Sequence, residues 1–208
     1  MYTHFWKRFF DFIFSLSGLI ILSPLMLLVS IVLVVLNKGA GVLFYQMRPG
    51  KNERLFKVLK FKSMTEECDS DGNLLSNAER LTKFGKFIRS TSIDELPQLF
   101  NIVSGNMSFI GPRPLLIRYL PFYNETERKR HTVRPGITGL AQINGRNLID
   151  WETRLRLDVQ YVENLSFWSD IQIVFKTIRN VLTSKDIVID TKQELQDLDI
   201  ERQNRKQK

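Results

Sequence analysis

Two adjacent carboxylates, Asp94 and Glu95, are the residues in this chain whose types and spacing best fit a chemical role. They precede Pro97, which suits the first turn of a helix, and a helix N-terminus keeps nearby anions ionised at neutral pH. Such a pair can share one divalent cation, or one carboxylate can attack phosphorus while the other holds the metal. Hard oxygen ligands beside phosphates suit Mg2+, which usually takes one or two carboxylates. The alternative is structural, because Ser92-x-x-Glu95 also has the spacing of a capping box.

Arginines in stiff loops are a second candidate set. Arg113 stands between Pro112 and Pro114, and Arg146 stands between glycine and asparagine. A guanidinium group that is held in place at low entropic cost binds phosphate through paired hydrogen bonds. A helix cap or a surface ion pair would explain Arg113 equally well.

Other charged residues fit an anion site without being diagnostic of one. Lys60 and Arg89 add positive charge, which taken alone usually marks a solvated face. Asp158 lies within a predicted helix among basic residues, where an ion pair with Arg154 on the same helical face is the ordinary explanation.

The sequence patterns around these residues predict an α+β fold that is mainly helical, with a small β-hairpin or sheet. Strands are predicted at Val42–Gln46, Leu55–Lys62 and Leu140–Ile143, and helices at Leu81–Ser90, Pro97–Val103, Trp151–Asn164 and Phe167–Leu182. The helix at Leu81–Ser90 is amphipathic and basic, so it can pack on the domain or lie on an anionic membrane. Leu115–Tyr123 is another candidate interfacial segment.

The uncharged run from Phe12 to Leu36 predicts a membrane helix, because it is long enough to cross the hydrocarbon core of a bilayer. Ser23-Pro24 lies at its middle and predicts a kink. In lipid the carbonyl groups that proline leaves free need a partner, and the Ser23 hydroxyl is a nearby candidate donor.

Basic residues flank both ends of this run. Lys7 and Arg8 precede it, and Lys38, Arg48 and Lys51 follow it. Because positive residues favour the cytosolic side of a membrane, a bent helix that returns both ends to the cytosol satisfies the charges. A kinked helix that spans the membrane is the alternative that the residues leave open.

Composition bounds the remaining possibilities. The net charge of +8 and the pI near 9.7 suggest anionic partners, namely lipid headgroups, phosphorylated ligands or nucleic acid. Nucleic acid is disfavoured by the apolar run and by the lack of a recognition motif. We predict a membrane element over residues 1–38, a cytosolic catalytic domain over residues 39–185, and a charged tail over residues 186–208. The tail is expected to be flexible, as a disordered segment or a loose helix.

Over roughly residues 1 to 185, the sequence resembles the small monotopic phosphoglycosyl transferases, bacterial sugar transferases that initiate glycoconjugate assembly on a polyprenol carrier. The segments that carry the resemblance are Lys7-Arg8, Ser23-Pro24, Arg48-Pro49-Gly50, Lys60-Phe61-Lys62, Arg89, Ser92–Gln98, Gly111–Pro114, Arg134–Gly139 and Asn144-Gly145-Arg146. Together these motifs are specific, whereas any one of them alone is weak.

The resemblance implies a re-entrant membrane helix broken at Ser23-Pro24, an aspartyl nucleophile at Asp94 and a Mg2+ ligand at Glu95. It implies transfer of a phospho-sugar from a UDP-sugar to undecaprenyl phosphate, with release of UMP, at the cytoplasmic face of the bacterial inner membrane. The remaining site residues that it implies are Pro112, Arg113 and Pro114 facing the nucleotide, and Lys60, Arg89, Arg146 and Asp158 lining the site.

Two other classes of function fit parts of the sequence. A non-catalytic membrane scaffold would use Asp94 and Glu95 only as caps. A polytopic transferase with the same substrates would need more than one hydrophobic segment. Nothing in the sequence identifies the sugar, because few residues would touch the pyranose.

Overall fold

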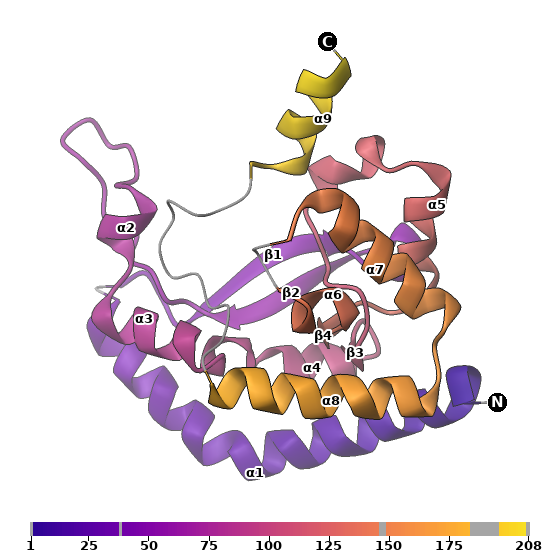
Figure 1. Cartoon of the computed structure of the whole chain (residues 1–208). Coiled ribbons are helices and arrows are strands. Elements are labelled where there is room, and N and C mark those ends of the chain that lie inside the picture. The colour runs from indigo at the N-terminus through magenta and orange to yellow at the C-terminus, as the bar shows by residue number, and fades with distance from the viewer. Residues whose placement is uncertain (1, 38, 146–148, 184–195, 207–208) are drawn as a thin grey trace.

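The computed structural model describes residues 2–37, 39–145, 149–183 and 196–206 (Figure 1). In chain order its elements are η1 Tyr2–Trp6, α1 Lys7–Leu36, β1 Leu43–Pro49, η2 Lys51–Glu53, β2 Leu55–Phe61, α2 Asn77–Arg80, α3 Lys83–Ser90, η3 Ile93–Glu95, α4 Gln98–Val103, β3 Ser108–Ile110, η4 Ile117–Phe122, α5 Glu125–Arg128, η5 Lys129–Thr132, β4 Gly136–Thr138, α6 Leu140–Ile143, α7 Trp151–Glu163, α8 Phe167–Leu182 and α9 Leu198–Lys206. The prediction of a mainly helical α+β fold with small sheets is confirmed. The domain boundaries predicted at residues 38 and 185 fall on residues outside the described ranges and stay predictions.

Helix α1 follows one side of the protein and bends near its middle, with the concave side toward the other elements (Figure 1). Ser23 Oγ donates to the Ile20 carbonyl at 2.8 Å. That carbonyl is the one left without its helical N–H donor by Pro24. The prediction that Ser23 satisfies a freed carbonyl is therefore confirmed. Among the described residues, α1 is also the one helix long and apolar enough to cross a membrane.

The N-terminal end of α1 is held by ionic contacts with the rest of the protein. Lys7 pairs with Asp170 of α8 at 2.7 Å. Arg8 donates to the carbonyls of Ile102 and Val103 at 2.6 and 2.8 Å, where the C-terminal end of α4 favours a cation. The sequence analysis used both basic residues as flanks that favour the cytosolic side; in the structure their side chains also bond within the protein.

The C-terminal end of α1 packs against the same body of the protein. Val29 and Leu33 are buried in one cluster with Phe61 of β2 and Ile88 of α3. Beyond them, the Asn37 side chain donates to the carbonyl of Lys62 at 2.8 Å. Both ends of α1 thus contact the rest of the protein. The N-terminal end contacts α4 and α8, and the C-terminal end contacts β2 and α3.

Strands β1 and β2 form an antiparallel hairpin in which Leu43 lies opposite Phe61 and Pro49 opposite Leu55, so the predicted hairpin is confirmed. Helix α4 closes the other edge of β2 through the buried Asn101. Its Oδ1 accepts from the Leu59 amide at 3.0 Å, and its Nδ2 donates to the Lys57 carbonyl at 2.7 Å. Asn101 therefore satisfies edge groups that have no strand partner.

A second, parallel pair joins β3 to β4, with Ser108 opposite Gly136 and Ile110 opposite Thr138. The strands approach so closely that a Cβ added at Gly136 would lie 2.1 Å from the Gly111 nitrogen. The prediction of a strand at Leu140–Ile143 is wrong, because these residues form helix α6. A run of apolar residues this short has no readable period, and packing against the cluster around Tyr161 selects the helix.

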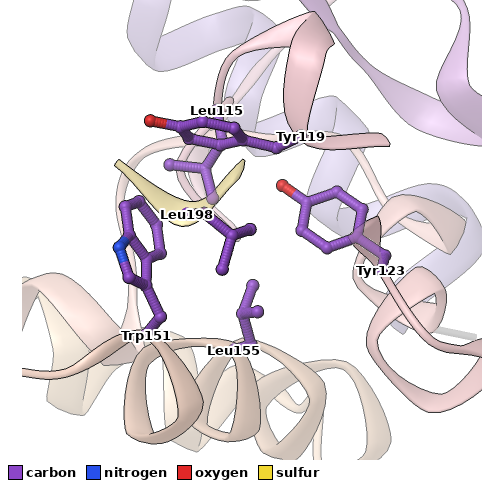
Figure 2. Packing of buried hydrophobic residues seen from close by; sticks show 6 residues of the cluster. All are labelled: Leu115, Tyr119, Tyr123, Trp151, Leu155 and Leu198. Atoms are coloured by element: carbon purple, nitrogen blue, oxygen red, sulfur yellow. The ribbon is translucent and has the colours of Figure 1, made fainter. Parts of the chain in front are cut away.

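The helices predicted at Trp151–Asn164 and Phe167–Leu182 are confirmed as α7 and α8. The described part of the tail contains helix α9. Leu198 of α9 is fully buried against Tyr119, Trp151 and Leu155 (Figure 2). The Trp151 indole also donates to the Gln196 carbonyl at 2.8 Å. Residues 198–206 are therefore a helix that an apolar side chain anchors, and the flexibility expected of residues 186–208 stays a prediction.

Replacing Asn101 with alanine is expected to lower the free energy of unfolding by about 2 kcal/mol, because the Leu59 amide and Lys57 carbonyl would lose their partner in a buried place. Chemical denaturation in detergent measures this change. Asn106→Ala is the matched control, because Asn106 is exposed, and its effect is expected to stay within about 0.5 kcal/mol. Equal effects of the two substitutions would contradict the role given to Asn101.

Candidate active site

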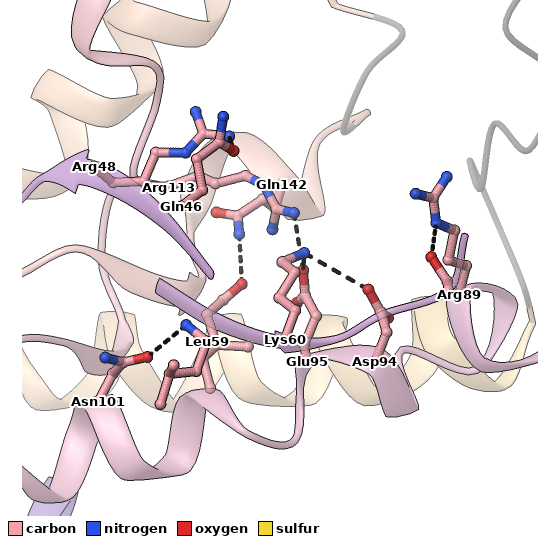
Figure 3. A network of polar contacts seen from close by, with 12 residues as sticks. Gln46, Arg48, Leu59, Lys60, Arg89, Asp94, Glu95, Asn101, Arg113 and Gln142 are labelled. Carbon is pink, nitrogen blue, oxygen red and sulfur yellow. Dashed lines mark hydrogen bonds and ion pairs between the residues drawn. The ribbon is translucent and has the colours of Figure 1, made fainter. Parts of the chain in front are cut away.

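Asp94 and Glu95 lie on the single turn η3, between α3 and α4. Ser92, just before this turn, has a φ of 57°, a left-handed conformation that is uncommon for residues other than glycine. Within the described residues its side chain forms no capping hydrogen bond, which excludes the capping-box alternative. Asp94 is 8% exposed, and its carboxylate is turned toward Lys60 (Figure 3).

Cations from two other segments hold these carboxylates. Lys60 Nζ of β2 lies 2.6 Å from Glu95 Oε1 and 3.7 Å from Asp94 Oδ2. Arg113, in the loop after β3, donates to the same Glu95 oxygen at 2.9 Å. The predicted residues Lys60, Asp94, Glu95 and Arg113 therefore form one ionic cluster (Figure 3).

The two carboxylates differ in charge stabilisation. Burial alone would raise the pKa of Glu95, but Arg113 and Lys60 outweigh it and hold that pKa far below its usual range. Burial raises the pKa of Asp94, and the opposing effect of Lys60 is countered by the adjacent Glu95. Glu95 is thus firmly ionised, whereas the charge of Asp94 is less stabilised by its surroundings.

The ionic cluster opens into a cavity of about 510 Å³, a volume typical of small-molecule sites. The predicted site residues that line it are Lys60, Arg89, Asp94, Glu95, Arg113 and Asp158. Arg89 belongs to α3, and its Nε donates to Ser63 Oγ at 2.9 Å. Gln46 and Arg48 of β1 also line the cavity, although they were not predicted as site residues.

Not every predicted residue reaches the cavity. Pro112 and Pro114 are outside its lining and instead shape the loop that carries Arg113. The Pro112 carbonyl accepts from the Gly136 amide at 3.0 Å, which ties this loop to β4. Arg146 lies outside the described residues.

Asp158 is buried and bound to Arg130, a residue that the sequence analysis missed. Arg130 Nη2 lies 2.7 Å from Asp158 Oδ2, and the two side chains are 1% and 3% exposed. The same Nη2 donates to the Arg113 carbonyl at 2.7 Å. Arg154 contributes a favourable charge to Asp158, but the close ion pair is with Arg130. Asp158 therefore lines the cavity and also holds Arg130, which in turn supports the backbone of Arg113.

The residues at the cluster fit a magnesium ion by donor type. In the described part of the chain, no group of three or more His, Cys, Asp or Glu side chains could enclose a metal. Mg2+ needs fewer, because it commonly takes one or two carboxylates and completes its shell with water and phosphate oxygens. Lys60 and Arg113 both contact Oε1 of Glu95, so Oε2 is the oxygen left for a metal among the described contacts.

The chain is similar to known sugar transferases. The bacterial sugar transferase family matches residues 2–184 of the chain. An uncharacterized sugar transferase of Bacillus subtilis (strain 168), EpsL, is 50% identical over 181 residues, which cover 87% of this chain and 89% of EpsL.

Longer relatives carry names that state an activity. The undecaprenyl-phosphate galactose phosphotransferase of Salmonella typhimurium is 39% identical, and the alignment covers 86% of this chain and 41% of the relative. The UDP-glucose:undecaprenyl-phosphate glucose-1-phosphate transferase of Klebsiella pneumoniae is 42% identical over 83% of this chain and 39% of the relative. The chain thus spans about two fifths of the length of these two proteins and most of EpsL.

Replacing Asp158 with asparagine is expected to cost about 3 kcal/mol of unfolding free energy or more, because it leaves the buried Arg130 without its counterion. The measurement is denaturant unfolding in detergent. Glu163→Gln is the matched control, since Glu163 pairs with Lys129 on the surface, with both side chains about half exposed, and its effect is expected to stay below about 1 kcal/mol. If Asp158→Asn were as mild as this control, the anchoring role of the buried pair would be refuted.

Proposed function

The chain belongs to the bacterial sugar transferase family, and from this premise we propose that it transfers a sugar 1-phosphate from a UDP-sugar to undecaprenyl phosphate. The observation that carries the proposal is the pair of carboxylates on η3, whose surroundings differ. Glu95 is fixed by two cations, and Asp94 faces the cavity. The names of the Salmonella and Klebsiella relatives support the substrate class. The sugar itself is left open.

In the first step we propose that an Asp94 oxygen attacks the phosphorus that bears the sugar. A bond forms between this oxygen and phosphorus as the bond from phosphorus to the bridging oxygen breaks, and the electron pair leaves with UMP. A bound Mg2+ would supply electrostatic stabilisation of the phosphate oxygens, with Glu95 as its protein ligand. Arg113 and Lys60 add positive charge beside the same reacting groups.

In the second step an oxygen of undecaprenyl phosphate attacks the same phosphorus. The bond to Asp94 breaks, the carboxylate is restored, and the phospho-sugar leaves on the lipid. No net proton transfer is needed in either step, which suits a site whose central groups are a carboxylate and permanent cations. Because the two bulky substrates react in turn, the cavity need not hold the donor and the acceptor at once.

We also propose that the protein is monotopic in the bacterial cytoplasmic membrane, with its site on the cytoplasmic face. A straight helix of the 30 residues in α1 would extend about 45 Å and carry one end to the far side of a bilayer. Lys7 and Leu33, near opposite ends of α1, both contact the body that carries the site. The bend at Pro24 supports a helix that enters and leaves on one side (Figure 1).

Asp94→Asn is expected to reduce UMP release by at least about 1,000-fold, because the amide cannot form the covalent intermediate. The assay follows UMP released from a panel of UDP-sugars with Mg2+ and undecaprenyl phosphate. Without the lipid acceptor, the wild-type protein is expected to release a single burst of UMP stoichiometric with enzyme. Asp71→Asn, in an exposed turn, is the matched control and should retain full activity. Full turnover by Asp94→Asn, or no acceptor-independent burst, would refute the two-step scheme.

Single cysteines at exposed positions on either side of α1 test the membrane arrangement. Phe5→Cys and Tyr45→Cys, each in a Cys68→Ser background, replace side chains that are 58% and 64% exposed. A membrane-impermeant maleimide is expected to label both in inside-out vesicles and neither in intact cells. Labelling of the two positions from opposite sides would show instead that α1 spans the membrane.

A further inference from the structure

Arg48 lines the cavity as a half-buried cation with a neutral partner. Its Nη2 donates to Gln46 Oε1 at 2.6 Å. Lys60 and Arg113, in contrast, are both paired with Glu95. Among the described residues, Arg48 forms no ion pair with a carboxylate, so its charge is available to an anion that enters the cavity.

The surroundings of Arg48 make an anion more favourable there. Burial, and after it the charge of Arg113, lower the pKa of Arg48 to about 10, and Arg118 acts in the same direction. Such a shift reports that the positive charge is incompletely compensated in the free protein. An anionic ligand between Arg48 and Arg113 would offset both desolvation and like-charge repulsion.

The sequence placed neither Gln46 nor Arg48 in the site, but their spacing explains the contact. Residues two apart on a strand point to the same face, so Gln46 and Arg48 project together from β1. The Gln46 amide oxygen holds the guanidinium group on this face without neutralising it. The arrangement fixes a phosphate-binding fork at low entropic cost.

The position of Arg48 relative to Asp94 indicates which phosphate it would meet. Arg48 and Arg113 lie on one side of Asp94, and Arg89 lies on the other (Figure 3). Arg89 belongs to α3, which packs through Ile88 against the apolar helix α1. If a phosphate dissolved in lipid approaches on the side that packs against α1 through Ile88, it meets Arg89. The water-soluble nucleotide would then meet Arg48.

We propose that Arg48 is a substrate-binding residue that acts together with Arg113 on the phosphate of the uridine nucleotide. This proposal rests on the proposed function and adds a residue to it. When the bond between the sugar-bearing phosphorus and the bridging oxygen breaks, the electron pair stays on the UMP phosphate, and two guanidinium groups face the growing charge. Arg48 itself gains and loses no proton in this step.

The test compares the binding of UMP and uridine to the full chain in detergent or nanodiscs by isothermal titration calorimetry. Arg48→Gln is expected to weaken UMP binding by about 10- to 100-fold, the loss of charge-assisted hydrogen bonds to one phosphate, and to leave uridine binding unchanged. Arg48→Lys keeps the charge without the fork and is expected to show an intermediate loss. Arg54→Gln, at an exposed arginine outside the cavity lining, is the matched control and should bind both ligands normally.

Two results would overturn the assignment of Arg48. One is an equal loss of UMP and uridine binding in both Arg48 variants. The other is unchanged UMP affinity together with a raised KM for undecaprenyl phosphate, which would move Arg48 to the lipid phosphate. Failure of the proposed function is distinct, because the wild-type protein would then release no UMP from any UDP-sugar with Mg2+ and lipid acceptor.

Discussion

The contact of Glu95 with both Lys60 and Arg113 joins three separate segments at one carboxylate oxygen, and the cavity depends on it. Each of these two cations is held in place by further contacts. Lys60 is part of the β-hairpin, and the backbone of Arg113 is held by Arg130, whose charge is balanced by the buried Asp158. A chain of ion pairs and one hydrogen bond to a backbone carbonyl thus runs from α7 to η3. With Glu95 occupied in this way, the charge of the neighbouring Asp94 is less stabilised than that of Glu95.

Helix α4 links this charge cluster to the apolar helix. It begins at Gln98, directly after the turn of the two carboxylates, and Arg8 of α1 binds the carbonyls at its other end. At Gly18 the two helices come close, since a Cβ added there would lie 3.4 Å from Leu99 Cδ1. The depth of the carboxylates relative to α1 is therefore set by rigid packing. The bend at Pro24, where Ser23 bonds the freed carbonyl, allows both ends of α1 to contact the rest of the protein.

Local patterns in the sequence predicted those structural features that depend on neighbouring residues. The alternation in Leu55–Phe61 and the apolar stripe of Phe167–Leu182 predicted a strand and a helix, and Ser23 before proline predicted its own hydrogen bond. Features made by distant contacts were not predicted. The ion pair of Asp158 with Arg130 produces no periodic pattern in the sequence. The anchoring of Leu198 depends on an apolar pocket that several other elements form. Arg113 was identified as a candidate by residue type and loop context, and Arg89 through the family resemblance, but only the fold brings them to opposite sides of one carboxylate.

The docking of α9 also bears on how such chains diversify. The family match ends at residue 184, yet Leu198 fills space between Tyr119, Trp151 and Leu155 of the matched region. A homologue that lacks this extension would leave two aromatic rings bare to solvent, unless other residues replaced them or another segment covered them. Substitutions at those three positions are thus expected to co-evolve with the presence of the extension, independently of Asp94 and Glu95.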